Sequence, residues 1–114
     1  MKHPHTIHQQ IAVNWEFPVT FTRGLFAPEN PVLVETLDRL GESRRHRAIV
    51  FIDGHVAAAC PQIAEQVRAY FAAHPQRLAL ALDAQIVPGG ESAKNDFAIV
   101  EGFMRLLLES HIDR

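Results

Sequence analysis

The feature that most constrains the fold is a continuous apolar run, Ala48-Ile49-Val50-Phe51-Ile52, which ends in Asp53. Runs of this kind are typical of central parallel strands, because such strands are covered on both faces. A second buried run extends from Leu78 to Leu82, and a helical pattern separates the two. Strands that alternate with helices in this way predict an α/β fold with a mainly parallel sheet.

Apolar residues at helical spacing predict three helices around these strands. They extend over residues 33–40, over residues 56–74, and from residue 97 almost to the end of the chain. Asn30-Pro31 supplies a start signal for the first helix and Gly41 a stop signal. Pro75 closes the second. The order of elements predicts a Rossmann-like fold of three layers.

The N-terminal part of the chain shows a different pattern, in which apolar and polar residues alternate. The apolar positions are Ile11, Val13, Trp15, Phe17, Val19 and Phe21. A period of two predicts half-buried strands, and Pro18 favours an edge position or a bend between two of them. We therefore expect an N-terminal strand pair within a domain spanning residues 11–114. Residues 1–10 contain three histidines without a recognised ligand spacing, so we expect a frayed terminus.

Composition excludes several classes of function. A chain of 114 residues with a formal charge of -2 predicts one globular domain that has no general attraction to nucleic acid or anionic membranes. No apolar run approaches the roughly 20 residues of a membrane helix, and no signal-peptide core is present. The single cysteine, Cys60, suits a reducing cytoplasm and is expected to be a small buried thiol. The basic run 44–47 is expected to be a solvated loop.

The strongest candidate for a binding site is the stretch 87–94, Val-Pro-Gly-Gly-Glu-Ser-Ala-Lys. Gly89 and Gly90 allow a backbone to approach a ligand closely. A helix that begins here offers unpaired N–H groups to an anion, and Glu91 and Lys94 share the face of its first turn. Ligands in parallel sheets bind beyond the carboxyl ends of the strands, where both this stretch and Asp53 lie. We expect them to line one crevice.

Asp53 and His55 each have two interpretations. The Asp53 carboxylate suits an acceptor for ribose hydroxyls and equally suits an N-cap for the next helix. His55 could bond a ligand or lie exposed at the helix start. A phosphoryl-accepting receiver domain is a weak alternative, because no acidic pair follows the first strand. No catalytic or metal-ligating set is apparent, which indicates a nucleotide or small-ligand half-site without a complete catalytic apparatus.

The order of elements and the motif Gly89-Gly90-Glu91-Ser92-Ala93-Lys94 together resemble 3-dehydroquinate synthase and the related sugar phosphate cyclases. The resemblance extends from about Val19 to Asp113 and covers the N-terminal part of the family's NAD-binding domain. It implies that Asp53 holds the adenosine ribose of NAD, with Glu91 and Lys94 near the nicotinamide side. The family commonly has Asn at the position of His55, which leaves the detail of ribose binding open.

The resemblance also implies that the complete family members carry parts that do not appear in this sequence. These are a glycine-rich pyrophosphate loop and a C-terminal domain that supplies the ligands of a divalent metal such as zinc or cobalt and the sugar phosphate site. The family's reaction is that of a carbon–oxygen lyase, which eliminates phosphate and forms a carbocycle. We therefore expect an NAD half-site that is inactive alone, with apolar surface around residues 104–108 that invites a homodimer. The alternative is a stand-alone α/β nucleotide-binding or protein-interaction module.

Overall fold

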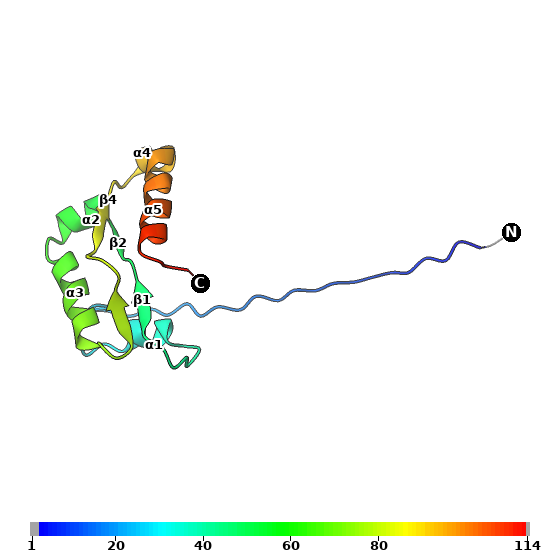
Figure 1. The fold of residues 1–114 in the computed structure, drawn as a ribbon, viewed down its shortest axis with the longest axis horizontal. Coiled ribbons are helices and arrows are strands. Elements are labelled where there is room, and N and C mark those ends of the chain that lie inside the picture. Colours follow the sequence, from blue (N-terminus) through cyan, green and yellow to red (C-terminus); the bar gives the residue numbers. More distant parts are fainter. Residues whose placement is uncertain (1–2, 114) are drawn as a thin grey trace.

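The computed structural model describes residues 3–113 and contains five helices and four short strands. In chain order they are α1 (Val32–Leu37), β1 (His46–Ala48), β2 (Phe51–Asp53), α2 (Gly54–Ala59), α3 (Ile63–Ala73), β3 (Leu78–Leu80), β4 (Gln85–Val87), α4 (Glu91–Lys94) and α5 (Phe97–Glu109). The architecture is mixed α/β (Figure 1). The expected apolar strands and the three expected helical regions are all present in it.

Both strand pairs are parallel. β1 pairs with β3, and β2 pairs with β4. Two residues separate β1 from β2, whereas four separate β3 from β4. The chain between β3 and β4 therefore bulges. Backbone bonds continue through this region, from Ala81 N to Ala48 O (2.9 Å) and from Gln85 N to Val50 O (2.8 Å). The expected parallel sheet therefore consists of two long, interrupted strands, residues 46–53 and 78–87.

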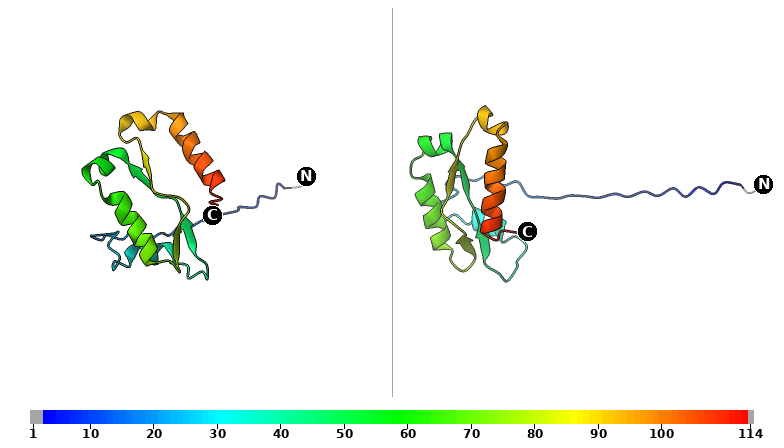
Figure 2. Two further views of the ribbon diagram at one scale, coloured as in Figure 1. Left: turned by 60° about the vertical axis from the view of Figure 1, so that its left-hand side comes forward. Right: turned by 45° about the horizontal axis from the view of Figure 1, so that its top comes forward.

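The helices lie on both sides of these strands. α2 and α3 connect the two strands and lie on one side, and α5 lies on the other (Figures 1 and 2). The Phe51 ring of β2 packs against Phe103 of α5, with ring centroids 4.5 Å apart. The helix expected over residues 56–74 is two helices, because Pro61 lacks the N–H that would continue the first. Cys60 is half-buried at this break.

The core lies between α1, α3 and the strands. Its buried apolar residues are Val34, Ile52, Val67, Tyr70, Phe71 and Leu78. The Tyr70 hydroxyl, at the centre of this cluster, donates a hydrogen bond to Asn30 O (2.7 Å) and accepts one from Val34 N (3.1 Å). These bonds attach α3 to the start of α1. Asn30 also marks that start, because its Oδ1 accepts a hydrogen bond from Val32 N at 2.9 Å.

The prediction of an N-terminal strand pair is wrong. Residues 3–22 form no helix or strand, and they extend away from the folded body (Figure 1, blue). Their apolar side chains are exposed, so this segment contributes little to the core. The alternating pattern reports a tendency to form a strand, but a strand requires a neighbouring backbone to bond to, and no described strand lies beside this segment. Residues 1–2 of the expected frayed terminus fall outside the described part of the chain.

The helix that begins in the Gly89–Lys94 stretch is short and separate from the helix that begins at Phe97. α4 ends at Lys94, and α5 begins at Phe97 with its own N-cap, Asp96. The Asp96 side chain accepts a hydrogen bond from Ala98 N at 3.0 Å, as a capping aspartate does.

Within residues 3–113, no helix combines the length and the hydropathy needed to cross a membrane.

Candidate functional site

The candidate site lies where β2 and β4 end. Asp53, the last residue of β2, is paired in register with Val87, the last residue of β4. Parallel pairing therefore brings the two chain segments that follow these strands side by side (Figure 1). One begins with Gly54 and α2, and the other contains Gly89 and Gly90. Asp53 and the glycine stretch therefore lie together at one edge of the sheet, and the crevice that we expect them to line stays a prediction.

Gly89 lies directly against the side chain of Asp53. A Cβ atom at this position would overlap both carboxylate oxygens, so only glycine lets the backbone pass this close. Gly54 is a second close approach, which the sequence analysis did not identify. A Cβ there would lie 3.2 Å from Val87 O, so glycine allows the start of α2 to pack against β4. The glycine directly after the strand-end aspartate was the available signal.

Asp53 caps α2. Its Oδ1 accepts hydrogen bonds from His55 N (2.7 Å) and Val56 N (3.4 Å), which have no partners within the helix. The capping role considered for this residue is therefore shown. Both bonds use the same oxygen, and no hydrogen bond from residues 3–113 reaches Oδ2. The carboxylate consequently keeps acceptor capacity on Oδ2.

Gly90 and His55 complete the contiguous part of the site. Gly90 has a φ of 86°, in the left-handed region that favours glycine. A Cβ on Gly90 would come within 3.6 Å of Cε1 in the His55 ring, so the imidazole lies beside this turn. His55 itself is exposed at the start of α2. The backbone N–H of His55 therefore bonds the Asp53 carboxylate, while its ring lies beside the glycine turn.

Glu91 and Lys94 lie on α4, the short helix that follows the turn. Lys94 Nζ is 2.8 Å from Glu91 Oε1, so the expectation that these residues share one face is confirmed. Both side chains are largely exposed, and a surface ion pair of this kind contributes little to stability. The pair is thus available to a ligand at low cost, because both groups keep most of their hydration.

Comparison with family models, with curated proteins and with solved structures found no match to this chain. The chemistry of the site therefore has to come from the residues themselves. Asp53, His55, Gly89 and Gly90 form one contiguous surface, with Glu91 and Lys94 on the next turn. This surface offers a carboxylate acceptor, an imidazole, backbone that a ligand can approach closely and one charge of each sign. It suits a hydroxyl-bearing ligand that also carries charge.

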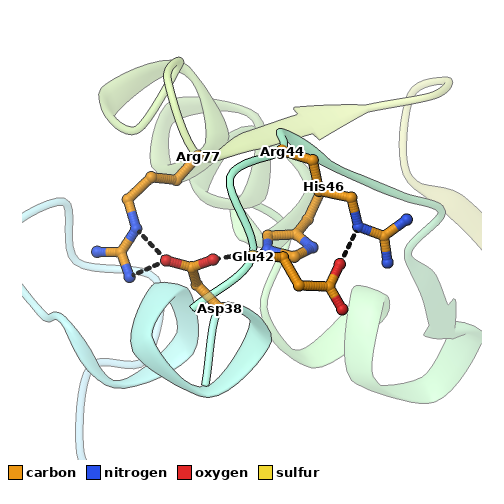
Figure 3. A network of polar contacts seen from close by, with 5 residues as sticks. All are labelled: Asp38, Glu42, Arg44, His46 and Arg77. Atoms are coloured by element: carbon orange, nitrogen blue, oxygen red, sulfur yellow. Dashed lines mark hydrogen bonds and ion pairs between the residues drawn. The ribbon is translucent and has the colours of Figure 1, made fainter. Parts of the chain in front are cut away.

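A second polar cluster lies at the opposite end of the strands (Figure 3). Asp38, just after α1, contacts His46 of β1 through Oδ1 (2.7 Å to Nε2). Its Oδ2 accepts hydrogen bonds from Arg77 Nε (3.0 Å) and Nη2 (2.7 Å). The hydrogen bond to His46 and then the bonds to Arg77 lower the pKa of the Asp38 carboxyl from its usual value. Glu42 pairs with Arg44 nearby.

This cluster corrects the expectation for the basic run 44–47. His46 and Arg47 belong to β1, and the Arg45 Nε donates a hydrogen bond to Leu78 O at 3.0 Å. His46 is half-buried by its contact with Asp38. Part of the run therefore joins α1, β1 and the turn before β3 and is not a freely solvated loop. Within residues 3–113, no three His, Cys, Asp or Glu side chains group as metal ligands.

Proposed function

We propose that this chain forms the N-terminal, NAD-binding part of a sugar phosphate cyclase similar to 3-dehydroquinate synthase. One observation carries the proposal. The register of β2 with β4 brings Asp53 against Gly89, at the edge of a parallel sheet where nucleotides bind. These are the two motifs on which the resemblance rests, and they lie 36 residues apart in the sequence.

The proposed contacts follow from the unoccupied bonding capacity of the site. Asp53 Oδ2 accepts hydrogen bonds from the adenosine ribose hydroxyls while Oδ1 continues to cap α2. The backbone at Gly89 and Gly90 passes close beneath the cofactor, because glycine has no side chain that would keep the cofactor away from it. Glu91 and Lys94 bond the cofactor toward its nicotinamide end. His55 contributes a further polar contact next to the ribose.

The finer fold belongs to the same proposal. Helices on both sides of a parallel strand pair support a three-layer, Rossmann-like arrangement, to which further strands of a complete domain would add. In the family's reaction, NAD accepts a hydride from a sugar phosphate, and a divalent metal assists the later steps. The residues of this chain supply one side of the cofactor site only. We therefore propose that the chain by itself binds NAD weakly and catalyses no lyase reaction.

Titration of NAD into ¹⁵N-labelled protein tests the proposal. We expect backbone amide shifts to move at His55, Gly89 and Gly90, with saturation only at high ligand concentration. AMP should move the same signals, whereas nicotinamide mononucleotide should not, because Asp53 is proposed to hold the adenosine ribose. Shifts confined to other parts of the chain would contradict the proposed site. A sub-micromolar dissociation constant for NAD would contradict the proposal that this chain supplies only half of the cofactor site.

Two glycine variants provide a matched comparison. Gly89→Ala places a methyl group where the Asp53 carboxylate lies, so it should displace that carboxylate and abolish the AMP-induced shifts. Gly102→Ala makes the same chemical change in α5, where a Cβ would have nothing within 4 Å. The second variant should bind AMP as the parent does, and it should be slightly more stable because alanine favours a helix. Equal binding by both variants would argue against the role of Gly89.

A further inference from the structure

The N-terminal arm, defined here as residues 11–21, has one apolar face without a partner. Its apolar residues occupy every odd position, namely Ile11, Val13, Trp15, Phe17, Val19 and Phe21. Their exposed fractions range from 68% for Val13 to 92% for Phe21. Side chains at alternate positions of an extended chain point to the same side, so these six form a continuous apolar stripe. A stripe of this length is typical of a segment that becomes covered.

The folded body offers a place where a strand could add. Among residues 3–113, each of its two long strands pairs with a neighbour on one side only. At the outer edge of 78–87, the backbone of Leu78 already has partners. Its N–H donates a hydrogen bond to His74 O (2.9 Å), and its carbonyl oxygen accepts one from Arg45 Nε (3.0 Å). The outer edge of 46–53 is the more open of the two. Beside β1 it borders a hollow of about 310 Å³ that is lined in part by Leu37, Ala48 and Ile112.

Asn30, at the start of α1, holds the base of the arm. The Asn30 Nδ2 group donates hydrogen bonds to Thr22 Oγ1 (3.0 Å), Arg23 O (2.9 Å) and Gly24 O (3.0 Å). Asn30 is itself fixed by the bond from the buried Tyr70 hydroxyl to its carbonyl. Near this point Phe21 still lines a hollow with residues of α1, and the remainder of the arm extends outward beyond the folded body (Figures 1 and 2). This geometry favours a partner in another molecule over the arm's own sheet.

We propose that the arm of one copy pairs as a strand with the outer edge of 46–53 in a second copy, and that the exchange is reciprocal. Charge is complementary, because Glu16 is the only charged residue of the arm and Arg47 belongs to β1 in the receiving strand. Each of the three arm aromatics buries roughly 150–250 Å² when covered. Two arms then bury on the order of 1,000 Å² from aromatic side chains alone, close to the roughly 1,200–2,000 Å² of stable interfaces.

Pro18 is compatible with this arrangement and specifies its register. Alternate residues of an edge strand direct their N–H groups toward the sheet, and proline is tolerated only where the N–H would face outward. Pro18 occupies an even position, so the odd positions are assigned to bond the sheet. The pairing consequently requires an N–H at Val13 and does not require one at Ala12.

Sedimentation and the fluorescence of Trp15, the only tryptophan of the chain, test the proposal together. We expect a monomer–dimer equilibrium in the full chain, with Trp15 emission shifting to shorter wavelength as the dimer forms, because the ring leaves water. The two signals should report the same dissociation constant. Trp15 is 88% exposed in the single chain, so its burial in a dimer should produce a large shift of the emission wavelength.

Matched variants distinguish strand pairing from nonspecific hydrophobic association. Val13→Lys places a charge on the covered face and should raise the dimer dissociation constant at least about tenfold, equivalent to about 1.4 kcal/mol. Asn14→Lys adds the same charge to the opposite face and should leave the constant nearly unchanged. Val13→Pro should abolish the dimer, whereas Ala12→Pro should preserve it. At concentrations below the dissociation constant of the dimer, far-UV circular dichroism should be equal in all four, because positions 12, 13 and 14 are exposed in the arm and lie outside the folded body.

Each of the other outcomes overturns the proposal. A monomer at every concentration with solvent-exposed Trp15 means that the arm has no partner in a second copy. A monomer with blue-shifted Trp15 emission means that the arm folds onto its own chain. A dimer whose Trp15 emission remains that of an exposed ring means that another surface, such as α5, forms the interface.

Discussion

At the scale of single residues, Asp53 divides two roles between the two oxygens of one carboxylate. Oδ1 satisfies backbone N–H groups at the start of α2, and Oδ2 accepts no hydrogen bond from residues 3–113. A carboxylate at the end of a strand can therefore start a helix and still present an acceptor to a ligand. The two interpretations of Asp53 are compatible, because they use different atoms.

Replacement of Asp53 by two different residues should separate these roles. Asp53→Ala removes the cap and should lower the free energy of unfolding by about 0.5–2 kcal/mol. Asp53→Asn retains a capping oxygen and should leave the stability within about 0.5 kcal/mol of the parent, because Asn and Asp cap equally well. Both should lose the AMP-induced shifts at Gly89. Urea unfolding followed by circular dichroism measures the first effect, and equal destabilisation by the two variants would contradict the capping role.

At the scale of the elements, the contacts of Asp38 join three parts of the chain that are separate in sequence. They connect the end of α1 to β1 through His46, and to the turn before β3 through Arg77 (Figure 3). The partners are more distant than any helical or strand period reaches, and no periodicity in the sequence indicates them. They arise because β1 and β3 are parallel neighbours, so the residues that precede both strands meet at one edge.

The lowered pKa of Asp38 makes part of the stability depend on pH. Because the folded state holds this carboxyl's pKa below its unfolded value of about 3.9, its contribution is fully present above that pH. It is lost as pH falls through the lower, folded pKa, because the unfolded state binds the proton more readily. Asp38→Asn should therefore be less stable at pH 7 and lose less stability between pH 5 and pH 2.

The matched control for this prediction is Asp83→Asn. Asp83 also contacts an arginine, with 3.3 Å between its Oδ1 and Arg68 Nε, but its side chain is mostly exposed. An exposed pair contributes little, so this variant should reproduce the parent's loss of stability in acid. Thermal unfolding at a series of pH values measures both. Identical acid profiles for parent and Asp38→Asn would show that the Asp38 contacts do not stabilise the fold.

At the scale of the whole molecule, the hydrophobic core consists of few side chains. The longest dimension, 78 Å, largely reflects the extended N-terminal segment and not the folded body (Figure 1). The fully buried residues gather around Tyr70, which contacts the rings of Phe26, Phe71 and His74. A small core makes each buried hydrogen bond a large fraction of the total stability.

Tyr70→Phe tests this dependence on a single buried group. The change removes a hydroxyl that serves Asn30 O and Val34 N, and leaves both backbone groups without that partner. We expect the free energy of unfolding to fall by about 1–3 kcal/mol. Thr36→Val removes a hydroxyl that bonds Val32 O on the exposed side of α1, and should change stability by no more than about 0.5 kcal/mol. Chemical denaturation of both variants provides the measurement, and equal effects would contradict the central role of Tyr70.

The secondary structure was predictable where the local pattern and tertiary contacts agree. The apolar runs that begin at Ala48 and Leu78 became parallel strands, and the periodic residues after Phe97 became α5. The prediction of a single helix over residues 56–74 failed at its break, where Pro61 outweighed the periodicity after α2. The candidate site was predictable as a meeting of two strand ends, because parallel pairing follows from chain order.

The chain order of its apolar runs and its glycines is enough to specify an α/β fold whose strand-end residues share an edge. That much is local, because periodicity and turn residues act within a few positions of the chain. Only the tertiary structure decided that Gly89 lies against Asp53, that Asp38 bridges His46 and Arg77, and that residues 11–21 find no strand to pair with. The reason is physical. A strand, a half-buried ion pair and a close backbone approach each need a partner, and the partner's position is set by how the elements pack.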